Sequence, residues 1–147
     1  MIQSSAEKLM RNPKWNDPPA LLTGNPMNRR ALEYLRGLSA HSDAAEPLCR
    51  AVQNLPDAET WCADPLRYGY VIAYTGDVVF GFVAGMQGFC LRLSDAAVRD
   101  AIDEGAQAFE EVGEDWVFIA LFDQNHRVPR IRHWIEMAYA YAHAHKH

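Results

Sequence analysis

The residues best suited to chemistry gather in the stretch FDQNHRVPRIRHW, residues 122–134. This stretch lies between an apolar segment that is expected to be a strand and a segment that is expected to be a helix. Loops at the ends of strands often carry catalytic or binding residues. Asp123 can orient His126 as a general base, while Arg127 and Arg130 can donate hydrogen bonds to an anion. The stretch is therefore a candidate site of a small enzyme or an anionic-ligand-binding protein. The alternative is that Asp123 or Asn125 caps the last helix while the arginines pair with surface carboxylates.

Arg92 is a further candidate, because it lies within the apolar segment FCLRL, residues 89–93. A charged side chain in an apolar strand must reach solvent, a carboxylate or a ligand. Asp77 and Glu104 are possible carboxylate partners within the chain. The alternative is that Arg92 contributes to an anionic-ligand site.

Catalysis needs a further participant, because a His–Asp pair acts on a nucleophile or an electrophile. The chain has no G-x-S-x-G, H-E-x-x-H, P-loop or G-x-G-x-x-G motif. Gly81, Gly85 and Gly88 do not predict a phosphate loop, because they join strand to strand and not strand to helix. We expect Gly81 to mark a bulge or a close backbone approach. The sequence predicts neither a catalytic set nor a cofactor.

Four of the six histidines lie in the last segment, residues 133–147. On a helix, His143 and His147 would share one face, a spacing that suits two ligands of one zinc ion. Two ligands are too few, because a structural zinc site usually has four and a catalytic site three. We expect a helix end whose basic residues suit the helix dipole, and we predict no metal site.

The composition fits one globular domain of 147 residues, with 49% hydrophobic and 22% charged residues. A net charge of −5 argues against a general nucleic-acid-binding surface, which normally draws on excess Lys and Arg. A local basic stripe remains the alternative. It would comprise Arg127, Arg130 and Arg132, together with Arg29, Arg30 or Arg36.

The three cysteines are Cys49, Cys62 and Cys90, an odd number without C-x-x-C spacing. Buried free thiols are the simplest interpretation, and they favour a reducing, cytoplasmic compartment. The first residues lack the apolar core of a signal peptide, and no stretch approaches 18 uninterrupted apolar residues. We expect neither export nor membrane insertion.

Residues 1–27 contain four prolines among Asn, Asp and Gly, a composition that excludes a long helix. We expect a proline-rich arm there and a single domain over residues 28–147. Apolar residues at helical spacing predict that this domain opens with two helices, over residues 28–40 and 42–55.

The pattern then changes to β-branched and aromatic residues, which predict a hairpin over residues 68–85 with its turn at Thr75, Gly76 and Asp77. A strand, a helix capped by Ser94, a strand and a last helix follow, over residues 89–93, 95–112, 115–123 and from 131 onward. This order predicts an α+β fold. Its core would be an antiparallel β-meander of about four strands with helices packed on it and a helical segment N-terminal to it.

The second and fourth of these strands, VVFGFVAG and WVFIALF, are hydrophobic at successive positions. A sheet with one wet face would alternate polar and apolar residues, so both faces are expected to be covered. Either the N-terminal helices or a second subunit covers the second face. We expect a homodimer.

Residues 69–142 resemble the YjbR/MmcQ-like family of small "double-wing" domains. The resemblance lies in the order of the hairpin, the strand FCLRLS opening a helix, the strand DWVFIAL and the helix IRHWIEMAYAYA, with Trp116 and the pair Ala138-Tyr139 in matching places. It implies a curved antiparallel sheet with packed helices. The family is loosely associated with DNA binding, but this chain has Arg92 alone on the third strand and Glu114-Asp115 before the tryptophan.

These observations favour a non-enzymatic binding or adaptor module that recognises a protein partner or a small ligand. The first alternative is a small enzyme or anionic-ligand-binding protein that uses Asp123, His126 and Arg127, with Arg92 and Arg130. The second alternative is nucleic-acid binding through the basic stripe, which the acidic balance disfavours. A fold-level resemblance does not choose among them.

Overall fold

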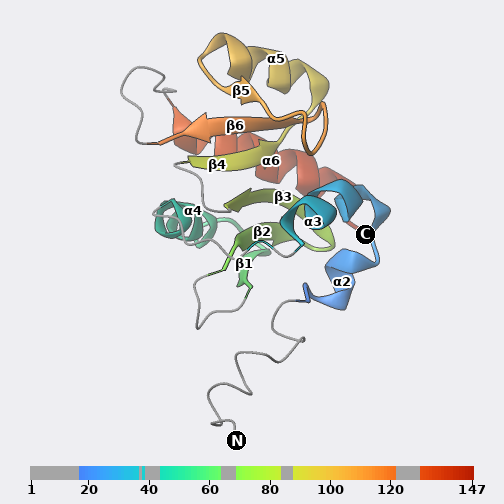
Figure 1. Cartoon of the computed structure of the whole chain (residues 1–147). Coiled ribbons are helices and arrows are strands. Elements are labelled where there is room, and N and C mark those ends of the chain that lie inside the picture. Colours follow the sequence, from blue (N-terminus) through green and yellow to red (C-terminus); the bar gives the residue numbers. More distant parts are fainter. Residues whose placement is uncertain (1–16, 37, 39–43, 64–68, 84–87, 122–129) are drawn as a thin grey trace, which may run out of the picture.

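The structure is a computed structural model that describes residues 17–36, 38, 44–63, 69–83, 88–121 and 130–147. It contains a six-stranded antiparallel sheet in the order β1-β2-β3-β4-β6-β5, with helices on both faces (Figure 1). The strands are β1 (Ala58–Cys62), β2 (Val71–Thr75), β3 (Val78–Val83), β4 (Gly88–Arg92), β5 (Gln107–Ala108) and β6 (Trp116–Ala120). The helices are α2 (Ala20–Thr23), the 3-10 helix η2 (Pro26–Asn28), α3 (Arg29–Leu35), α4 (Ala45–Val52), α5 (Asp95–Asp103) and α6 (Ile131–His145).

The predicted α+β class and antiparallel sheet are confirmed, but the sheet has six strands where about four were expected. The two additional strands, β1 and β5, form its edges. The helix predicted over 95–112 ends at Asp103, because Gly105 adopts φ 119° and turns the chain back toward β6. The last residues of that prediction therefore contain a short strand.

The hairpin between β2 and β3 has the predicted turn. Thr75 pairs with Val78 across Gly76 and Asp77, and Gly76 has φ 57°, a conformation that glycine adopts without steric cost. Further along, Ala73 pairs with Gly81 and Tyr74 with Val79, so β3 contains one extra residue. The extra residue is Phe80, so the bulge lies directly before Gly81.

Each face of the sheet carries its own hydrophobic core. On one face, α4, α5 and α6 bury Leu48, Val98 and Trp134 against strand residues that include Phe80 and Phe89. The residues of the second core are Leu22, Ala31, Leu35, Ala63, Tyr70, Ile72, Val79, Phe82, Cys90, Val112 and Trp116. Both faces are covered, as predicted, and α2 and α3 of the same chain take part in the second cover. The homodimer stays a prediction.

A buried polar cluster fastens the segment before α3 to the β2–β3 turn. Asn28 is fully buried; its Nδ2 donates to the carbonyl oxygens of Leu22 and Asp77, both at 2.8 Å, and its Oδ1 accepts from Val79 N at 2.9 Å. Asn25 Nδ2 donates to the carbonyl oxygen and to Oδ2 of Asp77, both at 3.1 Å. The described part of the arm is thus joined to the sheet by hydrogen bonds that solvent does not reach.

Two further features concern the helices. Ser94 caps α5 as predicted, accepting a hydrogen bond from Ala97 N at 3.4 Å. Among the described residues, no helix combines the length and apolar character that a membrane crossing requires.

Candidate functional site

Three of the predicted site residues, Asp123, His126 and Arg127, lie outside the described residues. The other two, Arg92 and Arg130, are described, and each has its own intramolecular partners. The structure does not bring these two arginines to a common partner.

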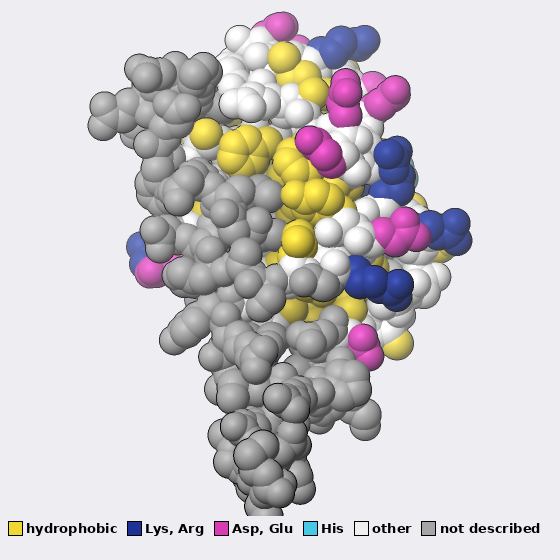
Figure 2. Space-filling view, in the orientation of Figure 1, with side chains coloured by type: hydrophobic (Ala, Val, Ile, Leu, Met, Phe, Trp, Pro, Cys, Tyr) yellow, Lys and Arg dark blue, Asp and Glu magenta, His cyan; other side chains and the backbone are white. Residues whose placement is uncertain are grey.

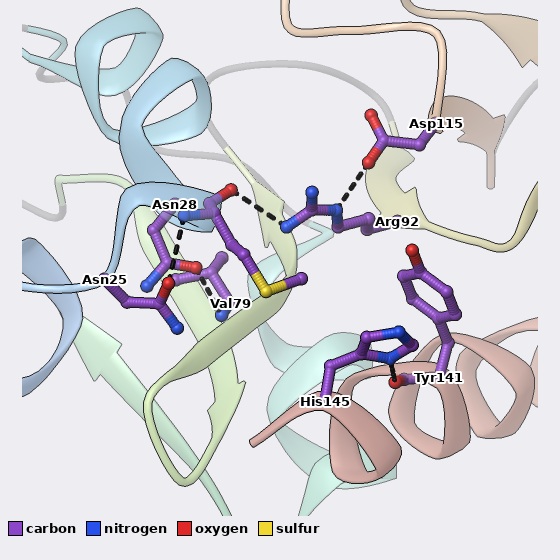
Figure 3. Close-up of polar contacts among 8 residues, drawn as sticks. Asn25, Asn28, Val79, Arg92, Asp115, Tyr141 and His145 are labelled. Carbon is purple, nitrogen blue, oxygen red and sulfur yellow. Dashed lines mark hydrogen bonds and ion pairs between the residues drawn. The ribbon is translucent and has the colours of Figure 1, made fainter. Parts of the chain in front are cut away.

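Arg92 is a structural link on the second face of the sheet. Its Nε lies 2.6 Å from Asp115 Oδ2, and its Nη1 donates to the carbonyl oxygen of Met27 at 2.8 Å (Figure 3). The expectation that Arg92 reaches a carboxylate is confirmed, but the two carboxylates suggested from the sequence were wrong. Asp77 instead binds Asn25, and Glu104 binds Arg130. With 12% of its side chain exposed, Arg92 joins β4 to the turn before β6 and to η2.

Arg130 fixes the start of α6. Its Nη2 lies 2.9 and 3.0 Å from the two carboxylate oxygens of Glu104, and its Nε lies 3.1 Å from one of them. Its guanidinium also lies 5.9 Å from the ring centre of Trp134, within the range of a cation–π contact. Arg130 precedes the helix in a left-handed conformation, with φ 59° and ψ 41°. These contacts hold the first turn of α6 against α5.

The candidate site is a cavity of about 560 Å³ between α4 and the start of α6, which we call the α4–α6 groove. Residues from α4 and the segment after it, from β4, from the end of β6 and from α6 line it. They are Glu46, Pro47, Arg50, Ala51, Asn54, Phe89, Leu121, Ile131, Arg132 and Ile135. Its volume lies within the range of small-molecule sites, about 300 to 1,000 Å³.

The groove has an apolar floor and a polar rim. Phe89 and Ile135 belong to the first hydrophobic core, while Leu121, Ile131 and Ala51 pack on that core and remain partly exposed. When an apolar ligand covers partly exposed apolar side chains, the removal of their surface from water favours binding. The floor therefore suits the apolar body of a small molecule.

The rim carries two arginines and one carboxylate. Arg50 pairs with Glu46 one helical turn away, and both side chains are about three-quarters exposed, at 74% and 76%. Arg132 is exposed and has no ion pair or side-chain hydrogen bond with the described residues. Its charge is therefore available to a ligand.

A second cavity, of about 380 Å³, lies between α5 and α6. Its lining includes Asp100, Asp103 and Glu104 beside Arg130 and Trp134. The Arg130 guanidinium pairs with Glu104 and lies over the Trp134 ring. This cavity contains the contacts that hold the first turn of α6.

The histidine-rich segment forms the end of a helix, as expected, with His143 and His145 in its last turn. Helix α6 ends at His145 and Lys146 is extended, with ψ 152°, so His143 and His147 do not share a helical face. His145 Nδ1 lies 2.7 Å from the carbonyl oxygen of Tyr141 (Figure 3), and the backbone N–H of His147 donates to Asp77 Oδ1 at 2.9 Å. The described residues include no group of three His, Cys, Asp or Glu side chains arranged to hold a metal ion.

The arginines of the predicted basic stripe lie on different elements and faces. Arg130 and Arg132 lie at the start of α6, which covers one face of the sheet, whereas Arg29 and Arg30 belong to α3 on the other face. Figure 1 shows α6 behind the sheet and α3 in front of it. Within the described residues, these arginines do not form one surface.

The second face also carries a group of aromatic side chains that α3 covers in part. Tyr34 contacts Phe109 edge to face at 5.3 Å, and Phe118 lies 6.5 Å from Phe109. Figure 2 shows hydrophobic side chains reaching the surface in the middle of this face, beside side chains of both charges. Burial raises the pKa of the Tyr34 phenol and that of the Cys90 thiol behind it. Tyr34 and Cys90 therefore stay protonated at neutral pH.

Two tyrosines next to β1 predict a loss of stability at high pH. Burial raises the pKa of Tyr70 to about 12, and burial with a 2.9 Å hydrogen bond to Glu59 raises the pKa of Tyr74 to about 12. The folded state thus binds protons that the unfolded state releases near pH 10. We expect their full contribution below about pH 10 and its loss as the pH rises to about 12.

Denaturant unfolding at a series of alkaline pH values measures this effect. Tyr70→Phe and Tyr74→Phe should each make the decline with pH shallower, because phenylalanine does not ionise. Absorbance of the phenolates should show late titrations near pH 12, and Tyr70→Phe and Tyr74→Phe should each remove one of them. Titration of both groups at the ordinary pKa of about 10 would contradict the prediction.

Comparisons of the chain with protein-family models, with curated proteins and with solved structures found no match. The resemblance to the YjbR/MmcQ-like family therefore stays a prediction.

Proposed function

We propose that this protein is a small-molecule-binding module whose site is the α4–α6 groove. The observation that supports the proposal is the combination of a cavity of about 560 Å³ with an apolar floor and a polar rim. Apolar walls with a few placed polar groups are typical of ligand sites. An apolar ligand body would cover Leu121, Ile131 and Ala51, which the fold leaves partly exposed.

Binding is favoured over turnover by the chemistry of the groove. Within its described lining, Glu46 is the only carboxylate, and it is exposed and paired with Arg50. A general acid or base has to contact the reacting groups of its substrate, whereas the Glu46 carboxylate is held by Arg50 at the exposed rim. We therefore propose recognition of a ligand without chemical conversion.

We further propose a reducing, cytoplasmic setting, which is supported by an odd number of cysteines, three, without C-x-x-C spacing. A homodimer and a protein partner both remain proposals. A dimer is not required to cover the second face, because α2 and α3 of the same chain help to cover it.

Filling the groove is expected to abolish ligand binding. N-phenyl-1-naphthylamine, an uncharged aromatic probe that fluoresces on entering apolar sites, should bind the wild-type protein. Ala51→Trp and Asn54→Trp each place a large ring in the groove lining and should weaken binding about tenfold or more, because the volume that the probe needs is taken. Fluorescence titration measures both affinities.

The matched control is Ala96→Trp, which adds the same ring at an exposed position of α5 outside the groove lining. It should bind the probe as the wild type does. Near-ultraviolet circular dichroism checks that all three variants keep their packing. The proposal is wrong if the wild type does not bind the probe, or if both groove variants bind it unchanged.

A further inference from the structure

We infer that the ligand of the α4–α6 groove is an amphipathic anion, with its charged group beside Arg132 and its apolar body on the floor. This inference rests on the proposed function and deepens it by giving the chemical class of the ligand. Three observations support it: the charges on the rim, the first turn of α6 and the separation of polar and apolar residues along the groove.

The first observation concerns the charges on the rim. Glu46 neutralises Arg50 within one turn of α4, which leaves Arg132 as the unmatched charge of the described lining. An unmatched guanidinium beside a cavity attracts an anion and can donate two parallel hydrogen bonds to a carboxylate, sulfonate or phosphate. The groove as a whole therefore favours a negatively charged ligand over a neutral or cationic one.

The second observation concerns the first turn of α6, which contributes Ile131 and Arg132 to the groove. This helix has 15 residues, no acidic residue in its first turn and no side-chain hydrogen bond at its N-cap, Arg130. The first backbone N–H groups of a helix have no partner within the helix and carry the positive end of its dipole. They add to the charge of Arg132 at the same end of the groove.

Glu104 pairs with Arg130, which leaves Arg132 as the arginine available to the ligand at this end of the groove. Because the Arg130 guanidinium is held by both carboxylate oxygens of Glu104, its charge is matched within the fold. The same contacts fix the turn that carries Arg132. Arg130 is therefore a positioning residue, and Arg132 is the residue expected to contact the ligand.

The third observation is the order of residues along α6. Arg132 lies in the first turn and is exposed, whereas Ile135, three residues later, is buried and faces the cavity beside Phe89. Along α6, the exposed Arg132 and the buried Ile135 of the lining are thus about one helical turn apart. A molecule that matches both parts has an anionic head and an apolar body.

A pair of fluorescent probes tests the inference. N-phenyl-1-naphthylamine and 8-anilino-1-naphthalenesulfonate share one aromatic body and differ in the sulfonate. We expect the wild type to bind the sulfonate more tightly. Arg132→Gln should weaken sulfonate binding about five- to tenfold, the effect of losing one charged contact in a partly exposed site, and should leave binding of the uncharged probe unchanged.

Arg99→Gln is the matched control, because it removes an exposed arginine from α5, outside the groove lining. It should bind both probes as the wild type does, which separates a local contact from a change in net charge. Arg132 is exposed, so Arg132→Gln is expected to fold normally, and thermal unfolding verifies this.

The possible results separate the two proposals. Equal affinity of the wild type for both probes, or a sulfonate affinity that Arg132→Gln leaves intact, would overturn the anion inference while the groove remains a binding site. Binding of neither probe would overturn the proposed function as well. Selective loss of sulfonate binding in Arg132→Gln, with Arg99→Gln unaffected, would support both.

Discussion

Replacing Asn28 by alanine is expected to lower the free energy of unfolding by about 3 kcal/mol, because three buried hydrogen bonds of about 1 kcal/mol each are lost. The side chain has no exposed surface and bridges Leu22, Asp77 and Val79. Alanine leaves the N–H of Val79 without this acceptor in a site that water does not reach, which adds to the cost. Urea-induced unfolding measures the change.

Two further variants show whether this loss is specific. Asn28→Asp keeps the acceptor for Val79 N but places a second carboxylate oxygen against the carbonyl oxygens of Leu22 and Asp77, so it should destabilise at least as strongly. Thr23→Ala removes an exposed hydrogen bond to Ala20 and should change stability by less than about 0.5 kcal/mol. A loss below about 1 kcal/mol for Asn28→Ala would show that the cluster is not a main fastening of this segment.

The sequence predicts the fold well where local chemistry decides the structure. The hairpin depends on glycine at a positive φ, the N-cap of α5 on the Ser94 hydroxyl, and the buried side of α6 on the spacing of Trp134, Ile135 and Ala138. The edge strands are harder to predict. β1 is mostly half-buried or exposed and β5 has two exposed residues, so neither shows a clear alternation, and pairing with a central strand defines them.

The site is less predictable, because the groove forms where distant segments pack together. Leu121, Ile131 and Arg132 border or belong to the stretch that the sequence singles out, but Arg50, Ala51 and Asn54 come from α4 and the residues after it. In the sequence, Arg50 is one more charge on the exposed side of a surface helix. The sequence pattern of α4 does not indicate that Arg50 faces the start of α6 across a groove. Arg92, in contrast, stands out in the sequence as a charged residue within an apolar strand. Its partner Asp115 cannot be identified without the pairing of β4 with β6.

Replacing Gly88 by alanine is expected to have the largest effect of any single substitution considered, a loss of about 4 kcal/mol or more. A Cβ atom at this position would lie 2.0 Å from the carbonyl oxygen of Ile119 and 2.9 Å from Ala120 Cα. Both are backbone atoms of β6, which pairs with β4 through Gly88 and Ala120. The clash can be relieved only if the two strands separate. Thermal and urea unfolding of the purified variant measure the loss.

Gly81→Ala separates the effect of a backbone clash from the general cost of replacing a strand glycine. At Gly81 an added Cβ would lie 3.1 Å from Leu91 Cδ2 and 3.3 Å from the carbonyl oxygen of Cys90, contacts that a shift of a few tenths of an ångström relieves, so we expect a loss of about 1 to 2 kcal/mol. Because Phe89 follows Gly88 and Leu121 follows Ala120, separation of the strands at this point would also open the floor of the α4–α6 groove. If any Gly88→Ala protein folds, it should therefore bind N-phenyl-1-naphthylamine weakly, whereas Gly81→Ala should bind it as the wild type does. Similar stability of the two variants would show that β6 can shift without breaking its pairing with β4.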